Sequence, residues 1–177
     1  YRKGETRNGE NYKSLSLGVK TSPTNFVYNL DLMGIELKRK VKVFSNKNGE
    51  KKQIEIDFED RHNLPPGFTP LGFGTVRVNF GSPKNYFNFD AVDIIKEKLK
   101  DGDSIYVSAE FNPSTYEVNG EKRTNVRYTI NSIGFLKEPI DFDSENFKEV
   151  ASFEQEFVVI NNELNREENK LYITGRL

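Results

Sequence analysis

Cysteine and tryptophan are absent from this chain of 177 residues, and histidine and methionine occur once each. A chain without cysteine can form neither a disulfide nor a thiolate metal site. Its apolar runs fall well short of the ~20 residues that a helix needs to span a bilayer, so we expect no membrane contact and a cytoplasmic location. The chain begins with Tyr1 rather than Met, which predicts a fragment of a longer protein or a trimmed product.

The sequence also lacks the motifs of common catalytic sites. Its glycines match no phosphate-binding loop, and there is no cysteine nucleophile. Glu55, Asp57 and Glu59 share one face of an expected strand near the single histidine, His62, but no second cluster accompanies them as a metal-dependent nuclease would need. An acidic, solvated strand face accounts for these residues. We therefore expect no enzymatic activity, no metal site and no cofactor.

Charge is unevenly distributed along the chain. The formal net charge is −1, but residues 131–177 carry 5 basic and 10 acidic side chains, whereas residues 1–130 carry 21 and 17. Opposite net charges on two segments suggest different roles. The basic part could bind phosphate, and the acidic part would repel phosphate or cover a basic groove when that groove is empty. The alternative interpretation is a solvated linker of ordinary charge.

Alternating apolar and polar residues predict β-strands over much of the chain. Fourteen phenylalanines and eight tyrosines indicate a Phe-rich core, with some aromatic residues left over for a surface. From Lys38 to Phe44 residues alternate between two faces, and Asn48-Gly49 is typical of a two-residue hairpin turn before a return strand at residues 53–58. The same alternation predicts a strand at residues 75–80.

Residues 85–136 show the clearest order of elements, which is a strand, a short helix, a strand, an Asn-Gly hairpin and a strand. Asp90 can cap the N-terminus of the helix, and Asp101-Gly102 ends it. This order is that of the second half of a five-stranded OB barrel, a β-barrel that commonly binds single-stranded nucleic acid.

These patterns predict a mainly β chain built on a five-stranded OB-fold barrel, with one short helix between strands 3 and 4 and a C-terminal β extension. We expect three segments along the chain. They are a flexible arm at residues 1–13, the OB-fold domain at residues 14–137, and an acidic linker with the start of a further β element at residues 138–177.

Three stretches of sequence resemble bacterial and phage single-stranded-DNA-binding proteins. Residues 86–107 (YFNFDAVDIIKEKLKDGDSIYV) resemble the strand–helix–LKKGDxVxV segment of that family. Residues 112–124 (NPSTYEVNGEKRT) look like the hairpin that follows it, and residues 129–136 (TINSIGFL) are similar to its closing strand. The front half departs from the family, because the usual first strand and its glycine are not recognisable. In addition, Tyr86 or Phe87 stands where a Trp opens the central strand.

The resemblance implies an OB-fold protein that binds single-stranded DNA in DNA replication, DNA recombination, or phage or plasmid DNA transfer. Single-stranded RNA is the alternative ligand, and replication proteins and further copies of the chain are the expected protein partners. In that family, a tyrosine and basic residues of the hairpin often contact DNA. The hairpin here offers Tyr116, Lys122 and Arg123, and Arg127 joins them as a candidate because it lies opposite the core face that carries Tyr128 and Ile130. A solvated hairpin is the alternative interpretation.

Two further sets of residues are candidates for contact with nucleic acid. Lys38, Lys40, Lys42 and Phe44 (the lysine stripe) offer three ammonium groups and a ring from one strand face, which suits phosphates and stackable bases. The alternative is an exposed strand that lysine keeps soluble. Tyr86 is the expected stacking residue of the central strand, because its neighbours Phe87 and Phe89 alternate as a buried pair would.

Sequence-tolerant binding of single-stranded DNA is therefore the leading hypothesis from the sequence. The clustered lysines and the projecting hairpin favour it. The alternative is a protein-interaction or scaffold OB domain without nucleic-acid binding, which a net charge near zero favours slightly. A fold that hosts many functions cannot decide between the two.

Overall fold

The computed structural model describes residues 1–47, 49–154 and 156–176. The described residues form twelve strands, one α-helix and one 3-10 helix, so the chain is mainly β as predicted, with more strands than the five expected. The chain divides into two compact units, Tyr1–Phe147 and Lys148–Leu177.

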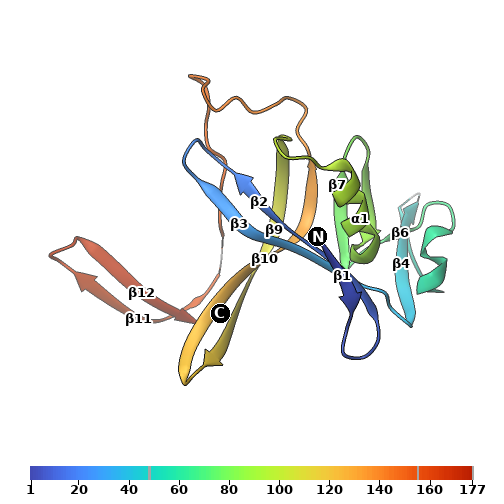
Figure 1. Cartoon of the computed structure of the whole chain (residues 1–177), viewed down its shortest axis with the longest axis horizontal. Coiled ribbons are helices and arrows are strands. Elements are labelled where there is room, and N and C mark those ends of the chain that lie inside the picture. Colours follow the sequence, from blue (N-terminus) through green and yellow to red (C-terminus); the bar gives the residue numbers. More distant parts are fainter. Residues whose placement is uncertain (48, 155, 177) are drawn as a thin grey trace. The chain divides into compact units, whose positions relative to one another are not determined.

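The first unit contains two sheets and both helices (Figure 1). Its strands are β1 (Arg2–Glu5), β2 (Asn11–Lys20), β3 (Phe26–Ile35), β4 (Lys40–Lys47), β5 (Glu50–Asp57), β6 (Thr69–Pro70), β7 (Thr75–Asn79), β8 (Pro83–Phe87), β9 (Ile105–Val118) and β10 (Glu121–Phe135). The 3-10 helix η1 spans Phe58–His62, and α1 spans Asn88–Lys98. The larger sheet has the order β1-β2-β3-β10-β7-β8, with β9 added on β10.

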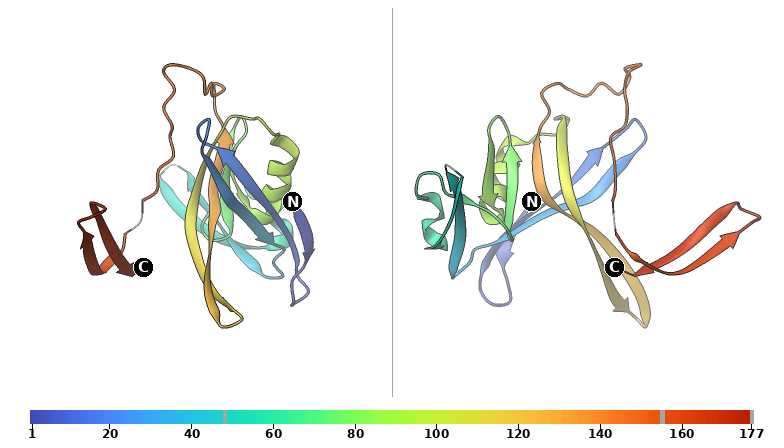
Figure 2. Two further views of the ribbon diagram at one scale, coloured as in Figure 1. Left: turned by 60° about the vertical axis from the view of Figure 1, so that its left-hand side comes forward. Right: turned by 180° about the vertical axis from the view of Figure 1, so that it is seen from behind.

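The larger sheet curls into a half-barrel around β10 (Figures 1 and 2). One edge of β10 pairs antiparallel with β9. The other edge pairs parallel with β3 at Tyr128 and Thr129, and then parallel with β7 from Ser132 to Gly134. A register shift between Ile130 and Ser132 separates the two parallel pairings. Because such a bulge bends and twists its strand, β10 can pair with β3 and then with β7 along the same edge.

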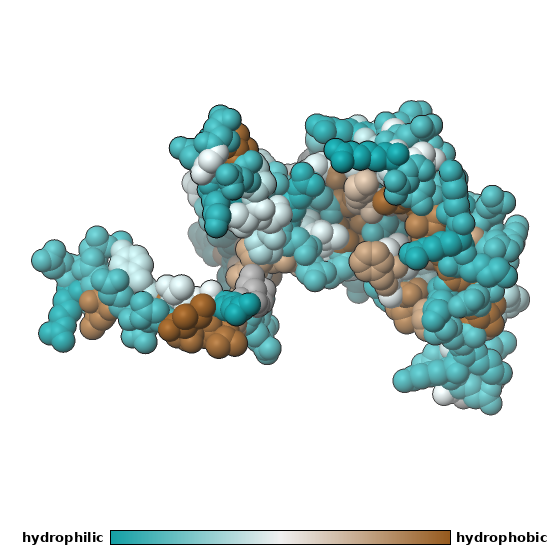
Figure 3. Space-filling model, turned by 90° about the horizontal axis from the view of Figure 1, so that it is seen from below, coloured by the Kyte–Doolittle hydropathy of each residue, from teal (hydrophilic) through white to brown (hydrophobic). Residues whose placement is uncertain are grey.

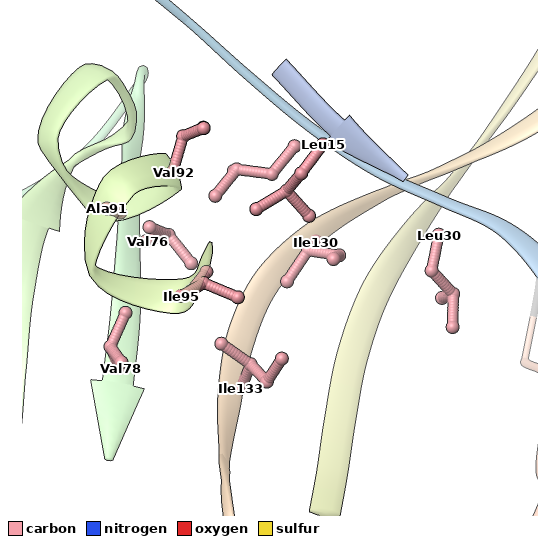
Figure 4. Close-up of a cluster of buried hydrophobic side chains, with 10 residues drawn as sticks. Leu15, Leu30, Val76, Val78, Ala91, Val92, Ile95, Ile130 and Ile133 are labelled. Atoms are coloured by element: carbon pink, nitrogen blue, oxygen red, sulfur yellow. The ribbon is translucent and has the colours of Figure 1, made fainter. Parts of the chain in front are cut away.

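The main core lies between α1 and the curled sheet (Figure 4). Ala91, Val92 and Ile95 are fully buried on one side of the helix. They pack with Val76 and Val78 of β7, and with apolar residues of β2, β3 and β10. The helix comes so close to β3 that a Cβ on Gly34 would overlap the backbone of Asn88 and Phe89.

The predicted lysine-rich strand and its return strand do not belong to the half-barrel. They form β4 and β5 of a separate three-stranded sheet with the order β5-β4-β6. Val41 and Val43 are buried there in a second cluster with Phe58, Phe87 and Phe89. Phe87 and Phe89 are thus core residues, as predicted. Asn48, the first residue of the expected turn, lies outside the described residues, and Gly49 has the positive φ of 79° that the turn requires.

The N-terminal segment, expected to be a flexible arm, forms a hairpin instead. β1 pairs antiparallel with the first residues of β2, from Arg2 opposite Ser14 to Glu5 opposite Asn11. Lys13 forms an ion pair with Asp93 of α1 (Nζ–Oδ2 2.5 Å). These are polar contacts on a largely solvated hairpin, so the segment has no apolar period by which the sequence could reveal it.

Helix α1 begins earlier than predicted, and Asp90 is not its cap. Phe87 occupies the N-cap position without a side-chain hydrogen bond, so Asp90 lies in the first turn. The Asp90 carboxylate instead accepts hydrogen bonds from Nε of Arg61 at 3.0 and 3.2 Å. Because both side chains are more than four-fifths buried, this pair ties η1 firmly to α1.

The second unit is built on one antiparallel hairpin of β11 (Val158–Asn165) and β12 (Lys170–Arg176). Register places Leu164 opposite Leu171, and both are more than half exposed. Hydrophobic side chains of this unit are visible at the left of Figure 3. Hydrogen bonds from Lys170 and Tyr172 lower the pKa of the Glu168 carboxyl. No described residue of this unit belongs to either core cluster, and an isolated two-stranded hairpin is marginally stable in water.

Candidate nucleic-acid interface

The long β9–β10 hairpin has a polar face turned away from the core. Every even-numbered residue of β9 from 106 to 116 is exposed, whereas Ile105, Val107 and Ala109 pack against the main core. In β10, Tyr128 packs against the core and Ile130 is buried within it. We call the opposite face of the two strands the outer face. Its central members are Asn112, Ser114, Tyr116, Arg123, Asn125, Arg127 and Thr129.

Cross-strand pairing brings three of the predicted hairpin residues together on the outer face. Arg123 lies directly opposite Tyr116, and Arg127 lies opposite Asn112. A shallow depression is lined by Asn112, Pro113, Ser114, Tyr116, Asn125, Arg127 and Thr129. Asn112 Nδ2 donates to Oγ1 of Thr129 at 2.9 Å, which fixes the polar floor of this depression. The result is a ring and two guanidinium groups over small hydrogen-bonding side chains.

The arginines of the outer face keep most of their hydrogen-bonding capacity. Arg127 is 65% exposed, and its Nε lies 3.8 Å from Oδ2 of Asp31, beyond hydrogen-bond distance. Arg123 contacts Glu121 at 3.4 Å with both side chains more than half exposed. Exposed ion pairs of this kind contribute little stability, typically ~0–1 kcal/mol. A phosphate can therefore replace either carboxylate at small cost.

Two other residues predicted to contact nucleic acid, Lys122 and Tyr86, do not lie on the outer face. Lys122 projects from the opposite face of β10, where register places it beside Glu117. Tyr86 lies opposite Val76 of β7 and packs partly buried against the main core, with Nζ of Lys84 5.1 Å from its ring centroid. Neither residue shares the outer face with Tyr116.

The three lysines of the lysine stripe are exposed and Phe44 is half-buried, and two of the lysines have an acidic residue directly opposite them. Lys40 lies opposite Asp57 and Lys42 lies opposite Glu55 in the β4–β5 pairing. Directly opposed side chains of antiparallel strands share one face and stand about 5 Å apart at Cβ. Lys38 precedes β4, and its ammonium donates to the carbonyl of Gly9 at 3.0 Å. The negative charge of Asp57 and Glu55 therefore weakens the attraction of the stripe for phosphate.

The sequence analysis missed two residues that lie on the outer face or next to it. Tyr106 is 37% exposed, and its ring covers Gly134, where a Cβ would come within 2.6 Å of it. Arg77 of β7 is not part of the outer face as defined, but it is exposed next to that face, opposite Ser132 of β10. Tyr106 alternates with the core residues Ile105 and Val107, and this alternation was a signal that could have placed it on the outer face.

Within residues 1–47, 49–154 and 156–176, no three acidic or histidine side chains gather into a metal-binding group. In the same part of the chain, no helix is both long and apolar enough to cross a membrane.

A family model matches residues 79–177, more than half of the chain. The chain belongs to the YorF family. The YorF match includes α1, the whole β9–β10 hairpin with its outer face, and the second unit, whereas the lysine stripe lies outside it. Neither the curated proteins nor the solved structures that were compared contain a match to the chain.

Proposed function

We propose that this protein binds single-stranded DNA with little sequence preference through the outer face of the β9–β10 hairpin. The observation that carries the proposal is the cross-strand arrangement of Tyr116, Arg123 and Arg127. Stacking of one base on an aromatic ring contributes ~1–3 kcal/mol whatever the base. One guanidinium group can donate two parallel hydrogen bonds to the oxygens of a phosphate. The amide and hydroxyl side chains that lie between the two arginines can bind sugar and phosphate.

The length of the outer face fits a short single strand. Tyr106 and Tyr116 are ten residues apart on β9, which corresponds to about 33 Å at ~3.3 Å per residue. OB folds bind about 4–16 nucleotides of single strand each. The two tyrosines therefore stand near the two ends of a path of suitable length.

We also propose that the half-barrel is an expanded form of the OB barrel found in single-stranded-DNA-binding proteins. The support is the order of α1 followed by the β9–β10 hairpin, together with the parallel pairing of β10 with β3. The additional strands and the separate β5-β4-β6 sheet are departures from a simple five-stranded barrel. The proposed settings are DNA replication, recombination, or phage or plasmid DNA transfer.

One observation favours the alternative, a protein-interaction domain. Leu164, Leu171 and Ile173 are each about half exposed on the hairpin of the second unit. Exposed apolar side chains that share one strand face are common at protein–protein interfaces. This surface is separate in sequence from the outer face, so a protein partner and a nucleic acid are not mutually exclusive.

Titration of a labelled oligonucleotide tests the proposal. We expect the full chain to bind a single strand of about 15 nucleotides more tightly than the matching duplex. The affinity should fall between about 50 mM and about 200 mM salt, because arginine–phosphate contacts release counterions. Absence of single-strand binding at the lower salt concentration, with the protein shown to be folded by circular dichroism, would overturn the proposal.

A further inference from the structure

Two aromatic rings lie exposed side by side at the tip of the β2–β3 hairpin. Phe26 and Tyr28 stack with their centroids 5.8 Å apart and their planes within 14° of parallel. Phe26 is 49% exposed and Tyr28 is 61% exposed. This flat pair, which we call the aromatic platform, is not part of either core cluster.

The local backbone holds the platform on the side of the hairpin away from the core. Val19 and Val27 are paired and pack against the main core, so Phe26 and its partner Lys20 point the opposite way. A register shift next to Gly18 brings Tyr28 over that glycine, where a Cβ would come within 3.2 Å of the ring. The small residue thus leaves room for the ring to lie flat.

A cation is held against the same surface. Nζ of Lys20 lies 5.9 Å from the Phe26 centroid and 5.0 Å from the centroid of Phe142. A groove of about 720 Å³ beside the platform includes these residues, and it continues to Lys96 and Lys100 near the end of α1, which lies on the core face of the sheet. Aromatic rings beside lysines are the combination that binds stacked bases and their phosphates.

The platform is on the same side of the sheet as the outer face. Ser16 pairs with Asp31 on the face that also carries Lys20, and Asp31 lies 3.8 Å from Arg127 of the outer face. Parallel pairing of β3 with β10 joins the two hairpins at this point. A single strand that crosses Arg127 can therefore continue onto the platform without passing around a sheet edge.

We infer that Phe26, Tyr28 and Lys20 form a second nucleobase-stacking site that extends the binding path of a longer single strand. The inference rests on the proposed function. It assigns the β2–β3 tip one type of ligand, an unpaired base with its neighbouring phosphate. A strand short enough to fill only the outer face does not reach the platform.

The test compares oligonucleotides of about 5 and about 15 nucleotides, near the ends of the range that one OB fold covers. The full chain is expected to bind the longer strand more tightly than the shorter one. Tyr28→Ala combined with Phe26→Ala should weaken binding of the longer strand about 5- to 100-fold, the loss of one stacked base. Binding of the shorter strand should stay within about twofold.

Phe73→Ala is the matched control, because Phe73 is a fully exposed phenylalanine on the loop before β7. It should leave the affinity for both strands unchanged. A second variant, Lys20→Gln, removes only one charge and should reduce the salt slope of the longer strand by about 0.7, the value for one phosphate of a single strand. Circular dichroism checks that each variant is folded.

The outcomes separate this inference from the proposed function. If neither strand binds, the proposed function fails, and the inference with it. If both strands bind but the double variant keeps the full advantage of the longer strand, the inference alone is overturned. The same conclusion follows if the unaltered chain binds both lengths equally well.

Discussion

Gly34 is the residue on which the contact between the half-barrel and α1 depends. A side chain at this position would overlap the backbone of Asn88 and Phe89, at the start of the helix. Backbone atoms cannot move aside as the end of a flexible side chain can. The absence of a Cβ at Gly34 therefore allows α1 to lie directly on β3, and this places the strand that follows the helix, β9, and the outer face.

We expect Gly34→Ala to lower the free energy of unfolding by about 3 kcal/mol, the upper end of the cost of overpacking. Gly4→Ala is the control, because the nearest atoms to its Cβ belong to the movable ring of Tyr12, and it should cost about 1 kcal/mol or less. Urea denaturation of the two variants and the unaltered chain measures both values. Equal costs would contradict the proposed close contact.

The candidate site could be predicted in part from single residues. The resemblance and the alternation in the sequence name Tyr116, Arg123 and Arg127 as candidates, and the structure places all three on one face of the hairpin. Lys122 was misplaced because adjacent residues of a strand point to opposite faces. The sequence does not single out Phe26 and Tyr28, because a bulge in the β2–β3 pairing changes the alternation there.

At the scale of elements, alternation predicted the strands that have one buried face. Val76 and Val78 of β7, and Ile54 and Ile56 of β5, point inward as expected. The pattern of Val41 and Val43 shows that one face of β4 is buried, but it does not show which element covers that face. In the structure, Phe58, Phe87 and Phe89 pack against Val41 and Val43. Strand β4 therefore belongs to a separate sheet and not to the half-barrel.

Elements held by polar contacts escaped prediction for a different reason. The β1–β2 hairpin contacts α1 through an ion pair between Lys13 and Asp93, which are 80 residues apart in the sequence. Helix α1 begins before Asp90, so the Asp90 carboxylate does not cap the helix and instead accepts a hydrogen bond from Arg61. Hydrophobic periodicity contains no information about such partners, because they are set by the tertiary fold.

At the scale of the whole molecule, part of the acidic segment predicted from the sequence lies next to a basic residue of the first unit. Phe142 lies against Lys20 of the aromatic platform, and the acidic side chains Asp141, Asp143 and Glu145 flank it in sequence. Backbone N of Ile140 donates to Oγ of Ser104 at 2.9 Å, which holds this segment against the first unit. The acidic segment therefore lies where it can compete with a phosphate for Lys20.

We expect the triple variant Asp141→Asn, Asp143→Asn and Glu145→Gln to bind single-stranded DNA about 2- to 10-fold more tightly at low salt. The gain should shrink at high salt, where charges more than ~10 Å apart are screened. Glu5→Gln, Glu59→Gln and Asp60→Asn together are the control, because they remove the same charge from other exposed positions of the first unit. An equal gain in the control would show a general charge effect.

The salt dependence of single-strand binding, measured on two paired variants, tests the central claim most directly. Arg123→Ala with Arg127→Ala should reduce the slope of log affinity against log salt by about 1.4, or about 0.7 for each phosphate lost. Lys40→Ala with Lys42→Ala removes the same charge from β4 and should leave the slope unchanged, because Asp57 and Glu55 stand opposite those lysines. The account is contradicted if the lysine pair lowers the slope and the arginine pair does not, since the nucleic acid would then follow β4 rather than the outer face.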